Sequence, residues 1–373
     1  MGTDNRNLTS AERLDWLRLY RSENVGPVTF YRLLERFGTA GRALEALPEL
    51  AKRGGGRKPI SVTSKAAAER ELAALDKLGG IMLASSEPQY PPAMRSLETA
   101  PLITVIGNPH ILTRPAVALV GARNASAIGR RMAHTLATEL GRAGFLVVSG
   151  MARGIDTAAH EGSLGTGTAA VLAGGVDVIY PPENAELYQR ICASGCAVSE
   201  MPPGTQPQAS HFPRRNRLIS GMALGVVVVE ASPKSGSLIT ARLALEQGRE
   251  VFAVPGSPLD PRCQGPNGLI KQGATLIESA DDVLQVLGDM LRRPLAEPKT
   301  GGFQGSSPSQ PDETELAEAR RTIIQSLAPA PVTVDEILRQ CQLSPAVVSL
   351  VLLELELAGR LERHPGNQVS ILP

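Results

Sequence analysis

Four segments in the middle of this sequence combine small residues with basic ones, beside stretches of strong helical or β character. They are Gly121-Ala-Arg-Asn-Ala-Ser126, Gly150-Met-Ala-Arg-Gly-Ile-Asp156, His211-Phe-Pro-Arg-Arg-Asn-Arg-Leu-Ile-Ser-Gly221 and Ala231-Ser-Pro-Lys-Ser-Gly-Ser-Leu-Ile-Thr240. Small residues let backbone N–H groups approach a ligand, a helix N-terminus attracts an anion, and Arg or Lys adds positive charge. Because ligands of open α/β sheets sit beyond the carboxyl ends of the strands, these segments predict one site for several phosphate groups.

The densest of these signals is an arginine run. Arg214, Arg215 and Arg217 are expected to begin a helix beside Phe212. A guanidinium group matches the geometry of a phosphate, and the ring of Phe212 offers a face on which a base can stack. A solvated charged helix face is the alternative, but Asn216 and two apolar residues are interleaved with the arginines. Since aromatic residues make up only 3% of the chain, we expect stacking from Phe212 and little else.

No arrangement of residues stands out as a catalytic set. Asp156 and His160 lie one helical turn apart and could form an acid–base pair, but we expect Asp156 to cap or orient Arg153 and His160 to pack beside its helix. Glu230 is expected to order neighbouring turns or arginines. Gly165-Thr-Gly-Thr-Ala-Ala170 has the letters of a dinucleotide fingerprint but precedes a strand, where the fingerprint must follow one. The sequence therefore predicts no cofactor, no metal and no enzymatic activity.

Composition and charge exclude several classes of protein. Lys and Arg total 38 against 37 Asp and Glu, a net charge of +1, so the chain is neither a globally basic nucleic-acid binder nor an acidic disordered chain. The longest apolar run, Gly221 to Val229, is far shorter than the about 20 residues of a membrane helix. The N-terminal residues show no apolar signal core, and the 4 scattered cysteines suit a reducing cytoplasm.

From about residue 101, β-branched runs alternate with helical stretches. The expected strands are Leu102–Ile106, Val117–Val120, Phe145–Ser149, Ala169–Ala173, Ala197–Ser199, Val226–Glu230, Val251–Val254 and Thr275–Ile277. The helices expected between them are Ile128–Ala143, Ile155–Leu164, Ala185–Ala193, Arg215–Ala223, Leu238–Gln247 and Asp281–Leu287. Several strands are apolar on both faces, as a parallel sheet covered by helices on both sides requires. Residues 87–291 therefore predict an α/β domain with a doubly wound parallel sheet.

Residues 1–86 are expected to form a small helical domain. Ser10 can cap a helix from Ala11 to about Arg21. The segment Asn24 to Gly38 then places a Gly-Pro turn before a short helix, which resembles a helix-hairpin-helix. Backbone N–H groups of such a turn can approach a phosphate; a helical packing domain without that role is the alternative.

The C-terminal part predicts a linker and a winged helix. Residues 292–312 are rich in Pro, Gly, Ser and Gln, which is typical of a linker. Within residues 313–373, three expected helices and a hairpin form the winged-helix pattern; they are Glu313–Leu327, Val334–Gln340, Pro345–Ala358 and the strands around His364-Pro-Gly-Asn367.

The third of these helices is unusual for a nucleic-acid reader. It contains no Lys, Arg, Asn or Gln, and apolar residues surround most of its circumference. We expect it to contact protein, within a dimer or with a partner, and not to read bases. Arg360, Arg363 and His364 on the wing are then the remaining candidates for phosphate contacts.

Five ordered motifs resemble the DNA processing protein A family, also called Smf, over residues 10–290. They are Val120-Gly-Ala-Arg123, Ser149-Gly-Met-Ala-Arg-Gly-Ile-Asp-x-x-Ala-His160, Phe212-Pro-Arg-Arg-Asn-Arg-Leu-Ile-Ser-Gly221, Lys234-Ser-Gly-Ser-Leu-Ile-Thr-Ala241 and Gly248-Arg-Glu-Val-Phe-Ala-Val-Pro-Gly256. The resemblance implies a sterile-alpha-motif-like N-terminal domain, an extended Rossmann-like core and a C-terminal winged helix. The family's first motif is usually Gly-Ser-Arg; here Ala122 removes one hydroxyl donor, which backbone N–H groups must replace.

The function implied by the resemblance is the binding of single-stranded DNA without catalysis. A member of this family is expected to bind and protect single-stranded DNA, to help load the RecA recombinase during natural transformation and recombination, and to act in the cytoplasm as a homodimer through its Rossmann core. The residues that this assigns to DNA contact are Gly121, Arg123, Ser149, Gly150, Arg153, Phe212, Arg214, Arg215, Asn216, Arg217, Lys234, Ser235, Gly236 and Ser237.

The sequence leaves two alternative functions and one alternative for the self-association surface. A nucleotide-processing enzyme similar to the lysine-decarboxylase-like phosphoribohydrolases is the alternative function, although Lys234–Thr240 lacks their Pro-Gly-Gly-x-Gly-Thr turn. A purely structural adaptor is a third possibility, against which the phosphate turns argue. Self-association is expected near Leu269-Ile270 and Leu276-Ile277, with ordinary core packing as the alternative.

Overall fold

The computed structural model describes residues 6–56, 58–97, 100–292, 313–364 and 366–372. The chain divides into two compact units. One consists of Met1–Leu8 and Arg70–Leu295 and holds the large sheet, whereas the other consists of Thr9–Glu69 and Ala296–Pro373 and so combines both ends of the chain. Most of the predicted linker, 292–312, lies outside the described residues.

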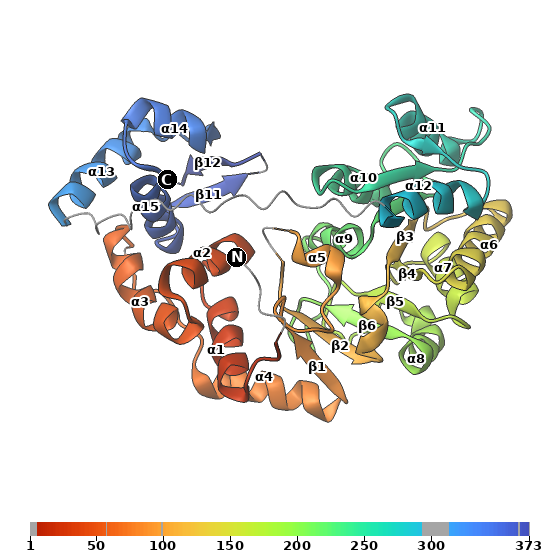
Figure 1. Ribbon diagram of the computed structural model, residues 1–373, viewed down its shortest axis with the longest axis horizontal. Helices are drawn as coiled ribbons and strands as arrows, with labels where there is room; N and C mark the ends of the chain where they lie inside the picture. Colours follow the sequence, from red (N-terminus) through yellow and green to blue (C-terminus); the bar gives the residue numbers. More distant parts are fainter. Residues whose placement is uncertain (1–5, 57, 98–99, 293–312, 365, 373) are drawn as a thin grey trace. The chain divides into compact units, whose positions relative to one another are not determined.

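The first unit is built on a nine-stranded sheet in the order β1-β2-β6-β5-β4-β3-β7-β8-β9 (Figure 1). Its strands are β1 Gly80–Leu83, β2 Ile103–Gly107, β3 Ala116–Val120, β4 Leu146–Ser149, β5 Thr168–Val171, β6 Cys196–Ser199, β7 Gly225–Val228, β8 Glu250–Ala253 and β9 Thr275–Leu276. The strands from β6 to β9 run parallel, while β2 pairs antiparallel with β6 and β1 antiparallel with β2. The predicted doubly wound sheet is confirmed, with an antiparallel edge that the sequence did not indicate.

The strand order changes direction between β3 and β7. From β3 the chain moves outward through β4, β5 and β6, and from β7 it moves the other way through β8 and β9. Because parallel crossovers are right-handed, the crossover helices of the two halves cover opposite faces of the sheet. The helix that follows the last strand packs on the same face as the crossover helices of the first half. β3 and β7 pair from Val117–Gly225 to Val120–Val228, so the turns that follow them leave the same edge side by side. This is the switch point at which doubly wound folds bind ligands.

Helices on both faces bury the sheet. They are α5 Pro92–Arg95, α6 Ala127–Arg142, α7 Ile155–Ser163, α8 Ala185–Ser194, α9 His211–Met222, α10 Gly236–Glu246, α11 Gln264–Lys271 and α12 Ala280–Arg292. Apolar residues of α6, α7 and α12 form one core with Val117, Val227 and Phe252 of the sheet. α9 and α10 pack against each other and against β3 and β7 respectively. The sheet edge at the switch point is thus held between rigid helices.

Helix α9 begins four residues earlier than the predicted Arg215–Ala223. It starts at His211, so the arginine run lies inside its first two turns. Pro213 is compatible with this start because the first turn of a helix does not need its backbone N–H groups.

The second unit contains the helices of both chain ends. They are α1 Ser10–Arg21, α2 Pro27–Phe37, α3 Ala40–Arg53 and the first part of α4 Lys65–Lys77, with α13 Glu313–Ser326, α14 Val334–Cys341 and α15 Pro345–Leu357. A three-stranded sheet in the order β10-β12-β11 completes it, with strands Val332–Thr333, Gln368–Ile371 and Leu361–His364. The predicted helical and winged-helix domains are both present.

The cap of α1 differs from the prediction. Thr9, and not Ser10, caps the helix: its hydroxyl oxygen accepts from the N–H of Glu12 at 3.3 Å, and the Glu12 carboxylate accepts from the N–H of Thr9 at 2.9 Å. Both donors of this capping box would otherwise lack an intrahelical partner.

Two adjacent residues at the edge strand β9 have opposite environments. Leu276 is 47% exposed, whereas Ile277 is fully buried in the core beneath α12. Ile277 therefore packs in the core and is not available for self-association. Leu276 is the residue of this pair whose side chain is exposed.

This placement gives a direct stability test. Ile277→Asp should lower the free energy of unfolding by at least about 3 kcal/mol, because it puts an unpaired charge into the core. Leu276→Asp should change it by no more than about 0.5 kcal/mol when the protein is dilute enough to be monomeric, because the new charge lies on the exposed side of the strand. Urea unfolding followed by circular dichroism measures both. Similar losses in the two variants would contradict the register of β9.

Candidate functional site

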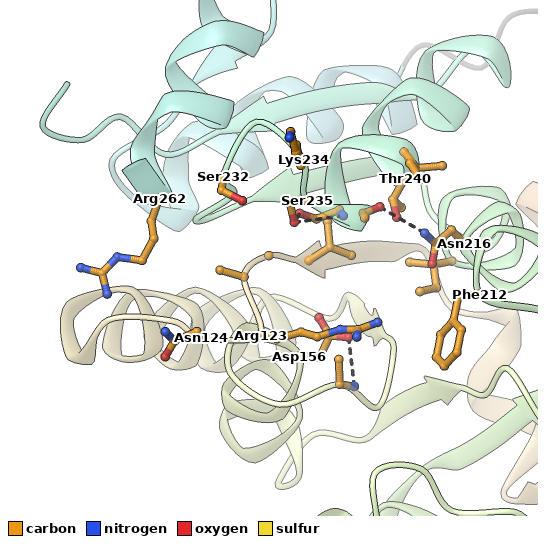
Figure 2. A pocket seen from close by; sticks show the side chains of 18 of the residues that line it. Arg123, Asn124, Asp156, Phe212, Asn216, Ser232, Lys234, Ser235, Thr240 and Arg262 are labelled. Carbon is orange, nitrogen blue, oxygen red and sulfur yellow. Dashed lines mark hydrogen bonds between the residues drawn. The ribbon is translucent and has the colours of Figure 1, made fainter. Parts of the chain in front are cut away.

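A cavity of about 700 Å³ lies beyond the carboxyl ends of β3 and β7 (Figure 2). All four small-and-basic segments of the sequence contribute residues to its wall. The predicted site residues that line it are Gly121, Arg123, Phe212, Arg215, Asn216, Lys234, Ser235, Gly236 and Ser237. The switch point of the sheet thus brings together turns that are more than 100 residues apart in the chain.

The N-terminus of α10 forms one side of the cavity. Ser235 caps the helix, and its hydroxyl oxygen accepts from the N–H of Ser237 at 3.4 Å. Lys234 is exposed just before the cap, and the Nδ2 group of Asn216 donates to the Gly236 carbonyl at 3.2 Å, which ties α9 to α10. A helix N-terminus beside a lysine favours an anion at this wall.

Arg215 lies at the bottom of the cavity as a nearly buried cation. Its side chain is 8% exposed, its Nη1 atom lies 4.0 Å from Oδ2 of Asp156, and its Nε has no hydrogen-bond partner among the described residues. Gly150 makes room for it, since a Cβ there would lie 1.6 Å from Nη1. Gly150 therefore serves the site by positioning Arg215, and it does not line the cavity.

Burial shifts the ionisation of the two acid–base candidates in opposite directions. It raises the pKa of Asp156 to about 6 even though Arg215 opposes the shift, and it lowers the pKa of His160 to about 4. The His160 ring nitrogens lie 2.6 Å from the Gly150 carbonyl oxygen and 2.8 Å from the Thr168 hydroxyl. His160 is thus a buried packing residue, as expected from the sequence.

The expected link between Asp156 and Arg153 is wrong. Arg153 pairs with Glu183 at 2.8 Å, and Asp156 faces Arg215 instead. Asp156 also accepts from the N–H of Ala152 at 3.3 Å, so it orders the turn after β4 from inside. Sequence spacing alone does not show on which side of this turn each side chain lies.

Three further predicted residues do not line the cavity. Arg217 and Arg214 face Glu200, at 2.5 Å and 3.8 Å respectively, on another side of α9. The hydroxyl of Ser149 is fully buried and donates to the Leu119 carbonyl at 2.6 Å. Ser149 thus joins β4 to β3 and has no exposed atom to offer a ligand.

A second cavity of about 430 Å³ adjoins the first and shares Arg123, Phe212 and Arg215 with it. Arg153, Tyr180 and Pro181 line only this second cavity. The rings of Tyr180 and Phe212 meet edge to face with centroids 5.8 Å apart, and the Arg123 guanidinium lies 5.5 Å from the Phe212 centroid. Tyr180 is 50% exposed, so this wall presents aromatic surface next to cations.

Several residues that line the two cavities were not predicted from the sequence, among them Tyr180 and Arg262. Tyr180 belongs to the loop after β5, which contains Gly174-Gly175 but no Lys or Arg before its Tyr-Pro-Pro run. Arg262 lines the main cavity from the segment Asp260–Arg262, held by an ion pair with Asp260 at 2.8 Å. The expectation that stacking comes from Phe212 and little else stays a prediction, but Tyr180 lies beside Phe212 and offers a second aromatic ring.

Other groups that could have carried chemistry have structural roles. The carboxylate of Glu230 accepts from the backbone N–H of Ser126 at 2.9 Å and from its hydroxyl at 2.6 Å, which orders the start of α6 as expected. The four cysteines are free. Over the described ranges, no group of three or more His, Cys, Asp or Glu is placed to hold a metal, and no helix is long and apolar enough to cross a membrane.

The raised pKa of Asp156 predicts a pH-dependent stability. The folded state holds the Asp156 proton up to about pH 6, whereas the unfolded chain releases it near 3.8, so the stabilising contribution of this group is lost as the pH rises through 6. The free energy of unfolding of the unmodified chain should therefore fall relative to that of Asp156→Asn between pH 4.5 and 7.5. Urea titrations at four pH values measure the difference; a difference that stays constant or grows with pH would contradict the assignment.

The chain matches known families over most of its length. Residues 81–288 match DNA recombination-mediator protein A, residues 10–74 the DprA-like N-terminal HHH domain, and residues 307–367 the DprA winged helix domain. It is 31% identical to Protein Smf of Synechocystis over 96% of this chain and 98% of that protein. It is 45% identical to DNA processing protein DprA of Bacillus subtilis over 58% of this chain and 75% of that protein.

Solved structures agree with this match. DNA processing protein A from Streptococcus pneumoniae superimposes with a TM-score of 0.62 at 34% identity, over 75% of this chain and 98% of that one. DNA processing protein A from Helicobacter pylori, whose structure concerns its single-stranded DNA binding mode, superimposes with a TM-score of 0.52 at 29% identity, over 57% of this chain and 96% of that one. The chain therefore belongs to the DNA recombination-mediator protein A family, to which the DprA and Smf proteins are assigned.

Proposed function

We propose that this chain binds and protects single-stranded DNA along the two adjoining cavities and performs no chemistry on it. The observation that carries the proposal is Arg215, a cation 8% exposed on the wall of a cavity that is also lined by Arg123, Lys234 and the N-terminus of α10. A buried guanidinium needs a charged partner on its open side, and a phosphate oxygen supplies one.

The aromatic wall favours a single strand over a duplex. Phosphates in the main cavity would place an unpaired base near Tyr180 and Phe212 in the second cavity, where stacking is open to any base. Bases of a duplex keep their faces stacked on one another and cannot use such a wall. The H. pylori relative, studied for its single-stranded DNA binding mode, supports the same ligand class.

The catalytic alternative is disfavoured by the groups that it would need. Glu230 is committed to Ser126, and His160 is buried against Gly150 and Thr168. Neither presents a free acid or base to the cavity. If the chain were a phosphoribohydrolase, it would release ribose 5-phosphate from nucleoside monophosphates. We expect no release above the rate measured without protein.

We propose in addition that this chain helps to load RecA onto single-stranded DNA, that it forms a homodimer and that it acts in the cytoplasm. A recombinase loaded onto this DNA needs access to most of its bases, and a strand held by phosphate contacts, with a base stacked only at Tyr180 and Phe212, would leave the other bases accessible. Leu276 is an exposed apolar side chain on the edge strand β9. A second copy of the chain could pack against it there, and the resulting dimer would bring two DNA sites together. We expect Leu276→Asp to give a folded monomer in sedimentation.

The phosphate wall can be tested by salt dependence. Arg123→Ala and Lys234→Ala should each weaken binding of fluorescent oligo-dT and make the log–log salt slope shallower by about 0.7, because each removes one neutralised phosphate. Arg242→Ala is the matched control, since Arg242 is exposed on α10, pairs with Glu246 at 3.6 Å and does not line the cavity. Slopes that are the same in all three variants would exclude these residues from the site.

The aromatic wall predicts a different signature. Tyr180→Ala and Phe212→Ala should each cost about 1–3 kcal/mol of binding free energy with the salt slope unchanged, because stacking releases no counterion. Tyr180→Phe should bind like the unmodified chain. Anisotropy titrations at several salt concentrations measure both quantities, and full affinity in Tyr180→Ala would remove this ring from the interface.

A further inference from the structure

Helix α15 is buried on two different sides. Val348, Val351, Leu352 and Leu355 pack into the core of the winged helix with residues of α13 and α14. A second set is equally inaccessible but lies outside that core: Leu350 at 3% exposed, Leu353 at 2%, Glu354 at 0% and Leu357 at 1%. A third helix that only closed its own domain would leave this second side open.

The second side is covered by the helical domain at the other end of the chain. α3 packs along α15, and the two helices lie side by side in Figure 1. Asn24 donates through Nδ2 to the Leu357 carbonyl at 3.1 Å, and Arg360 donates through Nη1 to the Gly54 carbonyl at 3.2 Å. Between them the backbones nearly touch, since a Cβ on Gly54 would lie 2.0 Å from the Glu354 carbonyl oxygen.

The charges of α15 and the wing are paired within the unit. Glu354 accepts a two-point contact from Arg320 of α13, with N–O distances of 2.6 and 3.1 Å, which lets its carboxylate be buried. Arg363 pairs with Glu356 at 2.8 Å, and the His364 ring lies 2.8 Å from the Ser370 hydroxyl. With Arg360 bonded to Gly54, each of the three wing residues expected to contact phosphate has a partner inside the unit.

We propose that α15, which stands where a winged helix presents its recognition helix to DNA, is a docking helix for the chain's own helical N-terminal domain. The two chain ends form one module, and the surface that would enter a major groove is occupied by α3. The apolar residues of α15 that lie outside the winged-helix core are thus buried without a dimer partner or another protein. This proposal does not rest on the single-stranded DNA site.

Gly54→Ala tests the docking in the full chain. Its methyl group would meet the Glu354 carbonyl at 2.0 Å and the Ala358 Cβ at 2.8 Å, while φ at Gly54 is −68° and suits alanine. Gly26→Ala is the matched control in the same helical domain, since nothing lies within 4 Å of its added Cβ. The probe is Leu353→Cys, whose maleimide labelling is read by peptide mass spectrometry.

We expect the thiol at 353 to be protected in the otherwise unmodified chain and with Gly26→Ala, and to label at least tenfold faster with Gly54→Ala. Equal rates in the two alanine variants, or rapid labelling in the unmodified background, would overturn the docking. Circular dichroism establishes that each variant is folded.

A crosslink keeps the proposal testable if Gly54→Ala does not fold. A Cβ on Gly56 would lie 3.7 Å from the Ala358 Cα, so Gly56→Cys with Ala358→Cys should form a disulfide within one chain on oxidation. No disulfide, or one that joins two chains, would overturn the proposal.

The affinity for duplex DNA distinguishes a docking helix from a DNA-reading helix that α3 covers. If α15 is a docking helix, Gly54→Ala should leave the affinity of the full chain for duplex DNA within about twofold. A tenfold gain in that affinity would mean that α3 masks a DNA-reading helix, and would contradict the role proposed for α15.

Discussion

The guanidinium of Arg215 lies under the turn at Gly150 and 4.0 Å from Asp156, almost out of contact with solvent. Holding a cation there is costly, because burial penalises the charge and the same burial raises the pKa of Asp156 to about 6. Burial thus disfavours the charged form of both members of the pair. We propose that a phosphate binds Arg215 from the cavity side and so offsets part of the cost of burying this cation.

The remainder of the first unit can be understood as support for that arrangement. The switch between β3 and β7 sets their turns side by side, Ser149 joins β4 to β3, and Glu230 fixes the start of α6. Asn216 holds α9 against α10, so the helix that carries Arg215 cannot slide relative to the helix that offers its N-terminus. Binding requires little reorganisation in such a site, which favours affinity.

The fold and the place of the site could be predicted because both follow from patterns that are local in sequence. Apolar β-branched runs identify the parallel strands, and topology then places the turns that follow them at one edge. Strand β1 was not predicted, because Gly80-Ile-Met-Leu83 is short and only one of its residues is β-branched. The side of α9 taken by Arg214 and Arg217, the approach of Tyr180 and Arg262, and the docking of α3 on α15 depend on tertiary contacts that no local pattern contains.

A DNA phosphate bound at Arg215 would change the electronic environment of the whole guanidinium group, so the Nε–H resonance of this residue reports on the proposed contact. Arg215→Lys assigns the resonance by its disappearance from the arginine region of a nitrogen–proton correlation spectrum. On titration with oligo-dT, we expect this resonance to shift and to saturate at the DNA concentration at which binding is complete. Saturated DNA binding with the Arg215 resonance unmoved would contradict the proposed contact.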